Sequence, residues 1–170
     1  GKMNIEQFNK LTDEDAKTEI TRCCCSSNWV KKVLENRPYN DKNSLLELAE
    51  KEWFNLSQDD WLEAFQHHPK IGDINSLSKK YANTQKWAEG EQSGVNSASE
   101  NIIHNLAQGN KDYEEKFDYI FIVCATGKTA QEMLEILNTR LPNTAEEEIK
   151  IAIGEQNKIT KIRLEKLLEI

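Results

Sequence analysis

Apolar residues recur at spacings of three and four along most of the chain, as expected where each helix turns one face toward a core. One such set combines Leu45, Leu46, Leu48 and Trp53, and a second combines Trp61, Leu62 and Phe65. No strict alternation of apolar and polar residues continues long enough to indicate a sheet. The pattern therefore predicts an all-α fold.

Six positions carry the residues expected at the start of a helix, with a hydroxyl three residues ahead of an acid. The hydroxyls belong to Thr12, Ser44, Ser57, Ser97, Thr129 and Thr144. In this capping-box arrangement, or its aspartate variant, the two side chains accept hydrogen bonds from backbone amides that the first turn leaves without partners. We therefore expect a helix to begin after each of the six.

Two segments depart from the helical pattern. Residues 119–125 are a short run of mostly β-branched and aromatic residues. Because no second run of this kind is available for pairing, we expect an extended segment or a helix end there. Residues 72–99 are rich in Asp, Asn, Ser, Lys and Gln, with thinly spread apolar residues. A long polar connection inside a compact helical domain is often functional, so we expect it to border the active site.

The bulk composition limits the class of protein. The 170 residues, 38% hydrophobic and 30% charged, suit one domain, which we assign to residues 3–170, with Gly1 and Lys2 as additions ahead of Met3. The net charge of −7 and the scattered basic residues argue against nucleic-acid binding, which needs a concentrated basic face. No apolar run is long enough to cross a bilayer and no signal peptide is apparent, so we expect no membrane partner and a cytoplasmic location.

The four cysteines are Cys23, Cys24, Cys25 and Cys124. Three in a row lack the spacing of a zinc knuckle or of a thioredoxin-type motif, so we expect no metal site. The simpler interpretation is a cluster of small residues at a buried helix end, because free cysteine is commonly buried. A thiol sensor is the alternative.

The first candidate for chemistry is His68. Pro69 disfavours helical geometry in the residue before it, so His68 should lie in an extended conformation at the end of the helix that contains Trp61 and Phe65. An imidazole at such a terminus is well placed to face a cleft, and it exchanges a proton near neutral pH. The alternative is a histidine that caps the helix or lies on the surface.

The second candidate is Arg163. On a helical wheel it falls near the middle of an apolar arc formed by Ile149, Ala152, Ile153, Ile159, Ile162, Leu164 and Leu167. A guanidinium that faces a core is costly unless it meets an anion or enough acceptors. We therefore expect Arg163 either to bind an anionic ligand or to pair with a buried Asp or Glu.

Several blocks of the sequence, taken in order and spacing, resemble the OHCU decarboxylases, the family that acts on 2-oxo-4-hydroxy-4-carboxy-5-ureidoimidazoline. The blocks include 24–29, 37–39, 61–65, 68–72, 91–92, 121–128, 140–141, 155–160 and 163–164. The likeness covers the chain nearly end to end. It implies a compact helical bundle that needs no cofactor and converts this anionic substrate into (S)-allantoin and CO2 in urate catabolism.

The resemblance also assigns roles to individual residues. The family's catalytic His, Glu and Arg map onto His68, Glu91 and Arg163, whereas His67 has no such counterpart. On its own, Glu91 in a polar loop is typical of a solvated surface residue. The substrate-binding positions are Pro69, Gln92, Ala88 and the backbone near Ile122 and Val123. Ala88 stands where the family often has Ser, so a hydroxyl contact with the substrate is either lost or supplied by another group. The resemblance leaves open a homodimer, for which the sequence itself supplies no interface.

The implied chemistry needs no electron sink beyond the substrate ring, because the ring delocalises the electrons that CO2 leaves behind. Arg163 and backbone amides would stabilise the developing charge, and His68, oriented by Glu91, would act as the acid–base group. The division of proton transfers between His68 and Glu91 stays open. The rival interpretations are a helical binding module without activity, a redox regulator built on Cys23–Cys25, and a decarboxylase of a related ring acid.

Overall fold

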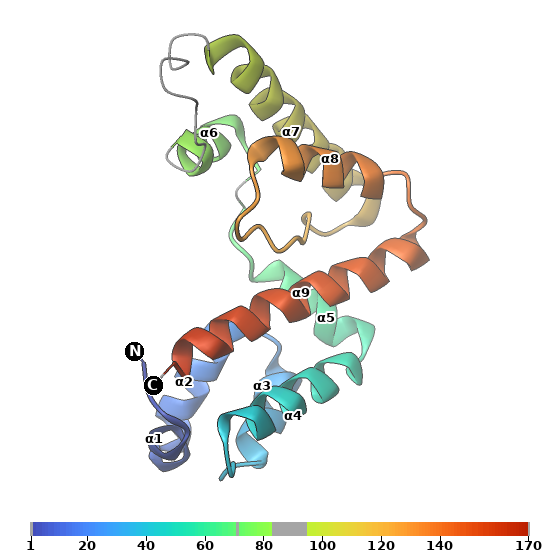
Figure 1. The fold of residues 1–170 in the computed structure, drawn as a ribbon. Coiled ribbons are helices and arrows are strands. Elements are labelled where there is room, and N and C mark those ends of the chain that lie inside the picture. The colour runs from blue at the N-terminus through green and yellow to red at the C-terminus, as the bar shows by residue number, and fades with distance from the viewer. Residues whose placement is uncertain (1, 71, 83–94, 170) are drawn as a thin grey trace. The chain divides into compact units, whose positions relative to one another are not determined.

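The computed structural model describes residues 2–70, 72–82 and 95–169, and the regular structure in these ranges is entirely helical (Figure 1). The helices are α1 (Ile5–Lys10), α2 (Asp13–Cys23), α3 (Ser27–Glu35), α4 (Lys42–Phe54), α5 (Gln58–Gln66), α6 (Ile74–Ala82), α7 (Val95–Phe117), α8 (Ala130–Arg140) and α9 (Ala145–Leu167). The predicted all-α fold is confirmed. None of these helices combines the length and apolar character needed to cross a membrane.

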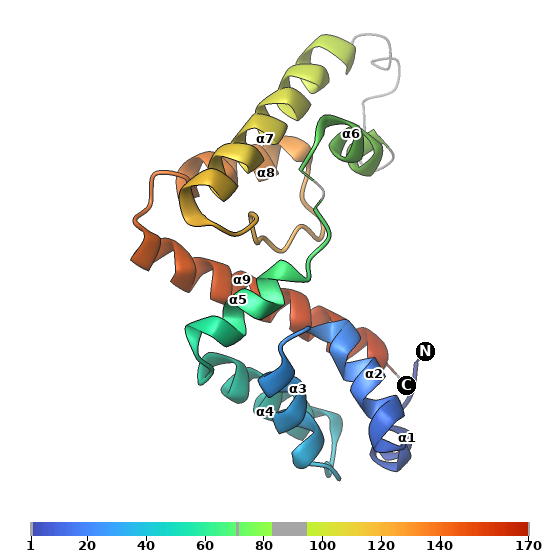
Figure 2. The same ribbon diagram turned by 180° about the vertical axis from the view of Figure 1, so that it is seen from behind.

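By their internal packing, these residues fall into two compact units. The first unit comprises Gly1–His67, Ile122–Cys124 and Ile151–Ile170, and the second comprises His68–Phe121 and Ala125–Lys150. In the first unit, α3 packs against α2, α4 and α5 (Figure 2). In the second, α7 packs against α6 and α8.

Four of the six expected helix starts are confirmed. The hydroxyl oxygens of Thr12, Ser57, Thr129 and Thr144 each accept a hydrogen bond from the backbone amide three residues later, at 3.1–3.4 Å. At the last three, the acid at that third position also accepts a hydrogen bond from the amide of the capping residue. The local sequence alone therefore fixes where α2, α5, α8 and α9 begin.

The other two expected starts are wrong. At α4 the N-cap is Asp41, whose carboxylate accepts hydrogen bonds from both the amide and the hydroxyl of Ser44, at 2.7 and 2.8 Å. An acid three residues earlier therefore takes the capping position that Ser44 was expected to fill. α7 begins at Val95, so Ser97 lies within the helix. A hydroxyl and an acid at this spacing also occur inside helices, where residues three apart share a face.

Tryptophans join the elements of the first unit. The fully buried indole of Trp29 on α3 donates to the carbonyl of Ala49 on α4, at 2.9 Å. The buried indole of Trp53 donates to the carbonyl of Ile153 on α9, also at 2.9 Å. Each indole thus buries a large apolar surface and also satisfies a carbonyl of a neighbouring helix, which fixes the register of α3, α4 and α9.

In the second unit a buried arginine joins α7, α8 and the first turns of α9. Arg140 donates from Nε and Nη2 to one carboxylate oxygen of Glu148, at 2.9 and 2.6 Å. Glu148 is fully buried and accepts a further hydrogen bond from the Tyr113 hydroxyl. The guanidinium carbon of Arg140 also lies 4.6 Å from the centre of the Phe121 ring, within the range of a cation–π contact. The buried Phe121 is therefore packed into the core of the second unit.

The polar connection 72–99 is partly helical. Asp73 accepts from the amide and the hydroxyl of Ser76 and so begins α6, on which Leu77 and Tyr81 are buried. A helix can form here although apolar residues are sparse, because Leu77 and Tyr81 are four residues apart and together cover one face of this short helix. Residues 83–94 lie outside the described residues. Residues 119–125 lie outside the helices and form no strand, as expected for a segment that follows a helix end.

The cysteine cluster lies at the end of α2, as predicted. Cys23 and Cys24 are buried, and all four cysteines are free thiols. Burial raises the pKa of both the Cys23 and the Cys24 thiol to about 12, although the charge of Arg163 acts in the opposite direction on each. Because the thiolate is the reactive species, these two thiols are poor redox sensors at neutral pH.

A glycine marks the close packing of α7 on α8. A Cβ atom on Gly109 would lie 2.3 Å from Cδ2 of the fully buried Leu137. We expect Gly109→Ala to lower the free energy of unfolding by roughly 1–2 kcal/mol, because overpacking outweighs the better helix propensity of alanine. Urea denaturation measures this value. In a Leu137→Ala background the same substitution should no longer destabilise the protein.

The matched control is Gly154→Ala on α9, where no atom lies within 4 Å of the added Cβ. This variant should be more stable by roughly 0.5–1 kcal/mol, because only the helix propensity changes. Equal stabilisation by both substitutions would contradict the close approach of α7 and α8.

The thiol environments predict selective reactivity. In the native protein at pH 8 only the half-buried Cys25 should react quickly with a disulfide reagent, and all four thiols should react after unfolding. Cys25→Ser should remove the fast phase. Between pH 9 and 12 the unfolded chain loses protons that Cys23 and Cys24 keep in the folded state, so stability should fall across that window. Fast modification of Cys23 or Cys24 would instead favour a redox regulator.

Candidate active site

The candidate histidine follows a helix end, as the sequence predicts. α5 ends at Gln66 and His67 is its C-cap, so His68 is the first residue past the cap and Pro69 follows it. The His68 side chain is half-buried, whereas His67 and Pro69 are exposed. By chain division His68 and Pro69 belong to the second unit. His67 therefore occupies the cap position, and His68 follows it as the residue to which the prediction assigns the acid–base role.

Arg163 does not face the core, and the prediction that it does is wrong. The buried stripe of α9 in the first unit consists of Ala152, Ile153, Gln156, Thr160, Leu164 and Leu167. Arg163 is exposed and lies about 100° around the helix from Leu164, at the edge of this stripe. The apolar arc read from the sequence was displaced because it counted the half-buried Ile159 and Ile162 and left out the polar Gln156 and Thr160, which are buried.

The exposed guanidinium of Arg163 is only lightly held. Its Nη1 donates to the carbonyl of Cys23 at 3.3 Å. Within the described part of the chain it forms no ion pair with an Asp or Glu. A guanidinium has five N–H donors, so most of them remain available to an anion such as a carboxylate. The buried arginine–acid pair considered as the alternative for Arg163 exists in this chain at Arg140 and Glu148.

The predicted ring-binding backbone is anchored on the helix that carries Arg163. Ile122, Val123 and Cys124 belong to the first unit, and Ile122 and Cys124 are buried. The backbone amide of Cys124 donates to Oε1 of Glu155 at 3.1 Å. Glu155 was not singled out from the sequence, because an acid in a charge-rich helix normally indicates a solvated face. Its hydrogen bond with an amide 31 residues earlier in the chain becomes visible only in the structure.

Two parts of the predicted site belong to the first unit. Arg163 lies on α9, and the segment Ile122–Cys124 contacts the same helix through the hydrogen bond from the Cys124 amide to Glu155. Glu91, Gln92 and Ala88 lie outside the described residues. Their meeting with His68 and Arg163 stays a prediction.

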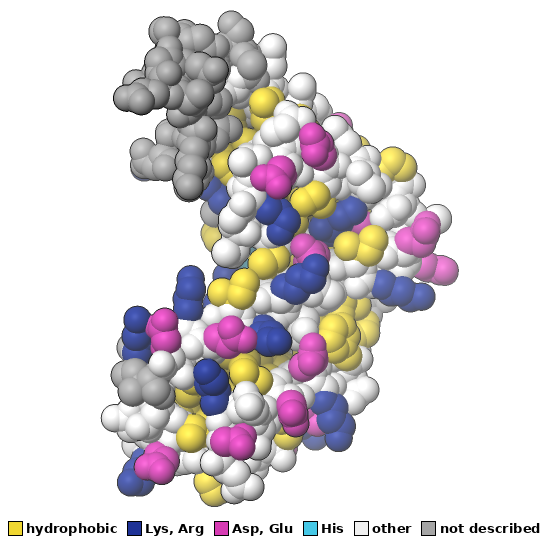
Figure 3. All heavy atoms as spheres, viewed as in Figure 1, with side chains coloured by type: hydrophobic (Ala, Val, Ile, Leu, Met, Phe, Trp, Pro, Cys, Tyr) yellow, Lys and Arg dark blue, Asp and Glu magenta, His cyan; other side chains and the backbone are white. Residues whose placement is uncertain are grey.

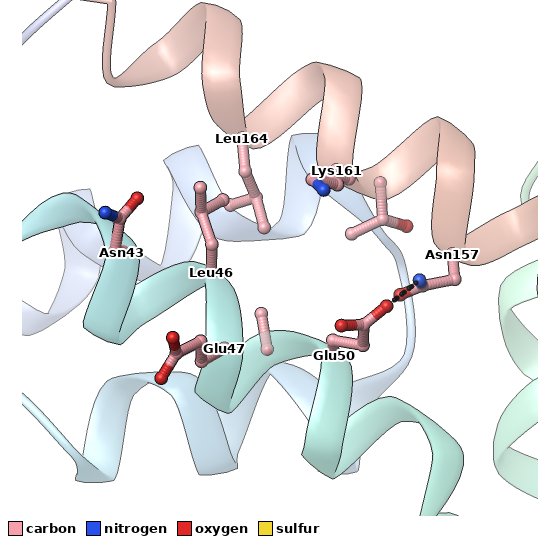
Figure 4. A pocket seen from close by; sticks show the side chains of 9 residues that line it. Asn43, Leu46, Glu47, Glu50, Asn157, Lys161 and Leu164 are labelled. Carbon is pink, nitrogen blue, oxygen red and sulfur yellow. Dashed lines mark hydrogen bonds between the residues drawn. The ribbon is translucent and has the colours of Figure 1, made fainter.

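A cavity of about 160 Å³ lies elsewhere in the first unit, between α4 and α9 (Figure 4). Its lining residues include Leu46, Glu47, Lys161 and Leu164, and a hydrogen bond of 2.8 Å from Asn157 to Glu50 crosses one end. None of the predicted site residues lines it. On the face shown in Figure 3, acidic and basic side chains are interspersed and form no continuous basic surface.

Comparisons with known proteins agree on one family. The chain matches the sequence model of the OHCU decarboxylases over residues 9–165. It is 36% identical over 146 residues to the uric acid degradation bifunctional protein TTL of Arabidopsis thaliana, a match that covers 85% of this chain and 45% of that protein. It is 21% identical to the 2-oxo-4-hydroxy-4-carboxy-5-ureidoimidazoline decarboxylase of Halalkalicoccus jeotgali, with 98% of this chain and 92% of that protein covered.

A solved structure gives the same result. The chain superimposes with a TM-score of 0.72 on a crystal structure of an OHCU decarboxylase determined in the presence of (S)-allantoin. The two are 35% identical, and the match covers 94% of this chain and 100% of that one. The chain spans less than half the length of the plant bifunctional relative. With a family match that extends over most of its length, this chain belongs to the OHCU decarboxylase family.

Proposed function

We propose that this protein decarboxylates 2-oxo-4-hydroxy-4-carboxy-5-ureidoimidazoline to (S)-allantoin and CO2 in urate degradation, without a cofactor. Besides family membership, the observation that carries the proposal is the state of Arg163. It is an exposed arginine without an acidic partner among the described residues, on the helix that anchors the segment Ile122–Cys124. A cation without an acidic partner, on a helix that also holds a backbone segment, suits a small anionic substrate.

The reaction balances with one proton. The bond between the ring carbon and the carboxylate breaks, CO2 leaves, and the bonding electron pair passes into the unsaturated ring. One proton is then delivered to the neighbouring ring carbon and one to the ring nitrogen that received the electrons, while the substrate hydroxyl loses its proton and becomes a carbonyl, so that the net uptake is one proton. Arg163 and backbone amides near Ile122 and Val123 stabilise the negative charge that develops on the ring oxygens. Because fixed donors need not reorganise during the reaction, they lower the barrier more than water would.

His68 supplies the acid–base group in this proposal. It is the first residue past the α5 cap, and its side chain is half-buried. It contacts the substrate hydroxyl, and Glu91 orients it. Gln92, Pro69 and the backbone at Ala88 complete the contacts with the ring. Proton delivery to one face of a planar intermediate sets the S configuration, whereas without an enzyme the proton arrives on either face.

The wider assignments follow from the same proposal. The protein acts as the domain 3–170 on an anionic ureidoimidazoline in the cytoplasm, and the family resemblance extends to a homodimer. The related ring acids that such a pocket would also admit are those that keep the ring oxygens and the hydroxyl next to the carboxylate, since Arg163 binds the ring oxygens and His68 contacts the hydroxyl.

The substrate is generated in place from urate with the two upstream enzymes, and the optical activity of the allantoin is followed. Wild type should give fast, S-enriched product. His68→Asn should slow the enzymatic reaction by about 10²–10⁴-fold, because the positioned acid–base group is lost while size and polarity are largely kept. The matched control is His67→Asn, which changes the neighbouring exposed residue and should retain the S enrichment.

Circular dichroism and thermal unfolding should show both variants folded like wild type. Racemic product at the uncatalysed rate with the wild-type protein would contradict the proposal and favour a binding module. Equal losses in both histidine variants would remove His68 from its catalytic role.

A further inference from the structure

The segment Ile122–Cys124 has no regular structure to orient its backbone. It lies outside the helices and pairs with no strand among the described residues. Buried backbone amides need partners, and a helix or sheet supplies them in a repeating ladder. Ile122 and Cys124 are 2% and 7% exposed, so solvent cannot replace such a ladder. Side chains from other elements must therefore set the direction of these amides.

Glu155 on α9 supplies such a side chain. Its Oε1 accepts the hydrogen bond of the Cys124 amide at 3.1 Å, and its Oε2 lies 2.6 Å from Nζ of Lys158. The Glu155 side chain is only 14% exposed, whereas that of Lys158 is 66% exposed. Because the cation is largely solvated, its pairing contributes little. Of these two contacts, the one with the Cys124 backbone is the one that joins α9 to the segment Ile122–Cys124.

The same helix carries Arg163. Eight residues separate it from Glu155, which corresponds to about 12 Å along the helix axis and about 80° around it. Between them, Gln156, Thr160 and Leu164 are buried and fix the rotation of α9 within the first unit. A helix held in this way is a rigid spacer. The hydrogen bond from the Cys124 amide to Glu155 therefore also sets the distance between the neighbouring amides and the Arg163 guanidinium.

We propose that Glu155 is a positioning residue for the decarboxylation. It holds the backbone amides of Ile122 and Val123 at a fixed distance from Arg163, so that both act on the same substrate anion. This inference rests on the proposed function for its catalytic part. Glu155 itself touches no substrate, and its effect passes through the backbone of Cys124. Misplacement of a catalytic donor by about 1 Å costs on the order of 10²-fold in rate.

Three variants test this role. Glu155→Ala removes the acceptor, and we expect kcat to fall by roughly 10- to 100-fold with a smaller change in KM, because donors aimed at the developing charge are displaced. Glu155→Gln keeps an amide oxygen at the same reach and should recover most of the lost kcat. Lys158→Met removes the exposed partner of the same carboxylate, leaves the contact with Cys124 and should retain wild-type kcat.

Amide hydrogen exchange of residues 119–126, followed by mass spectrometry without substrate, provides a readout that does not depend on activity. Exchange at this segment should rise by at least tenfold in Glu155→Ala and stay close to wild type in Glu155→Gln and Lys158→Met. Unchanged exchange in Glu155→Ala would overturn the positioning role even if the protein is a decarboxylase.

The activity and exchange results separate the two proposals. Raised exchange in Glu155→Ala together with an inactive wild type would reject the proposed function and retain the anchor. Raised exchange with unchanged kcat in an active enzyme would reduce Glu155 to a structural role and reject the inference. Equal loss of kcat in the Ala and Gln variants would show that charge, rather than the hydrogen bond to Cys124, is required.

Discussion

The first unit depends on how α9 buries a face that is not wholly apolar. Gln156 and Thr160 are 1% and 5% exposed, on the same stripe as Leu164. An unpaired amide or hydroxyl at such positions would cost roughly 1–3 kcal/mol. Here Gln156 donates to the Thr160 hydroxyl at 3.0 Å, and the Thr160 side chain in turn hydrogen bonds the Cys24 thiol. The hydrogen bond between Gln156 and Thr160 lies within α9 and satisfies both groups at any rotation of the helix, whereas the contact of Thr160 with Cys24 favours the rotation that lays this stripe against the end of α2.

This rotation decides which residues of α9 are left for function. With Gln156, Thr160 and Leu164 facing inward, Glu155 and Arg163 fall at the edges of the buried stripe. Glu155 reaches a backbone amide there, and Arg163 keeps most of its donors available. Arg140 shows the opposite solution in the second unit, where a buried guanidinium is paired with Glu148 and covered by Phe121. A buried, paired arginine stabilises one arrangement, whereas an exposed one can accept a ligand.

The sequence predicts those features that depend on local interactions. Thr12, Ser57, Thr129 and Thr144 cap their helices because both partners of each cap lie within four residues. The helix end before His68 follows in the same way from Pro69. The side of α9 that faces inward was not predictable, because Gln156 and Thr160 become acceptable in a core through hydrogen bonds such as those with each other and with Cys24, which the sequence pattern does not reveal. The capping pattern also failed at α4, because it counts a hydroxyl and an acid three residues apart and does not compare Ser44 with the stronger acceptor Asp41 that precedes it.

The candidate site divides in the same manner. His68 could be identified from its neighbours in the chain. Glu155 could not, because the role proposed for it depends on a hydrogen bond with an amide 31 residues away. Family resemblance identifies residues that touch the substrate, since these are the ones a reaction constrains most directly. Residues that hold a backbone segment in place affect the substrate only through that segment, and their side chain need only accept one hydrogen bond to do so. Packing, rather than sequence pattern, is therefore the evidence that identifies a positioning group such as Glu155.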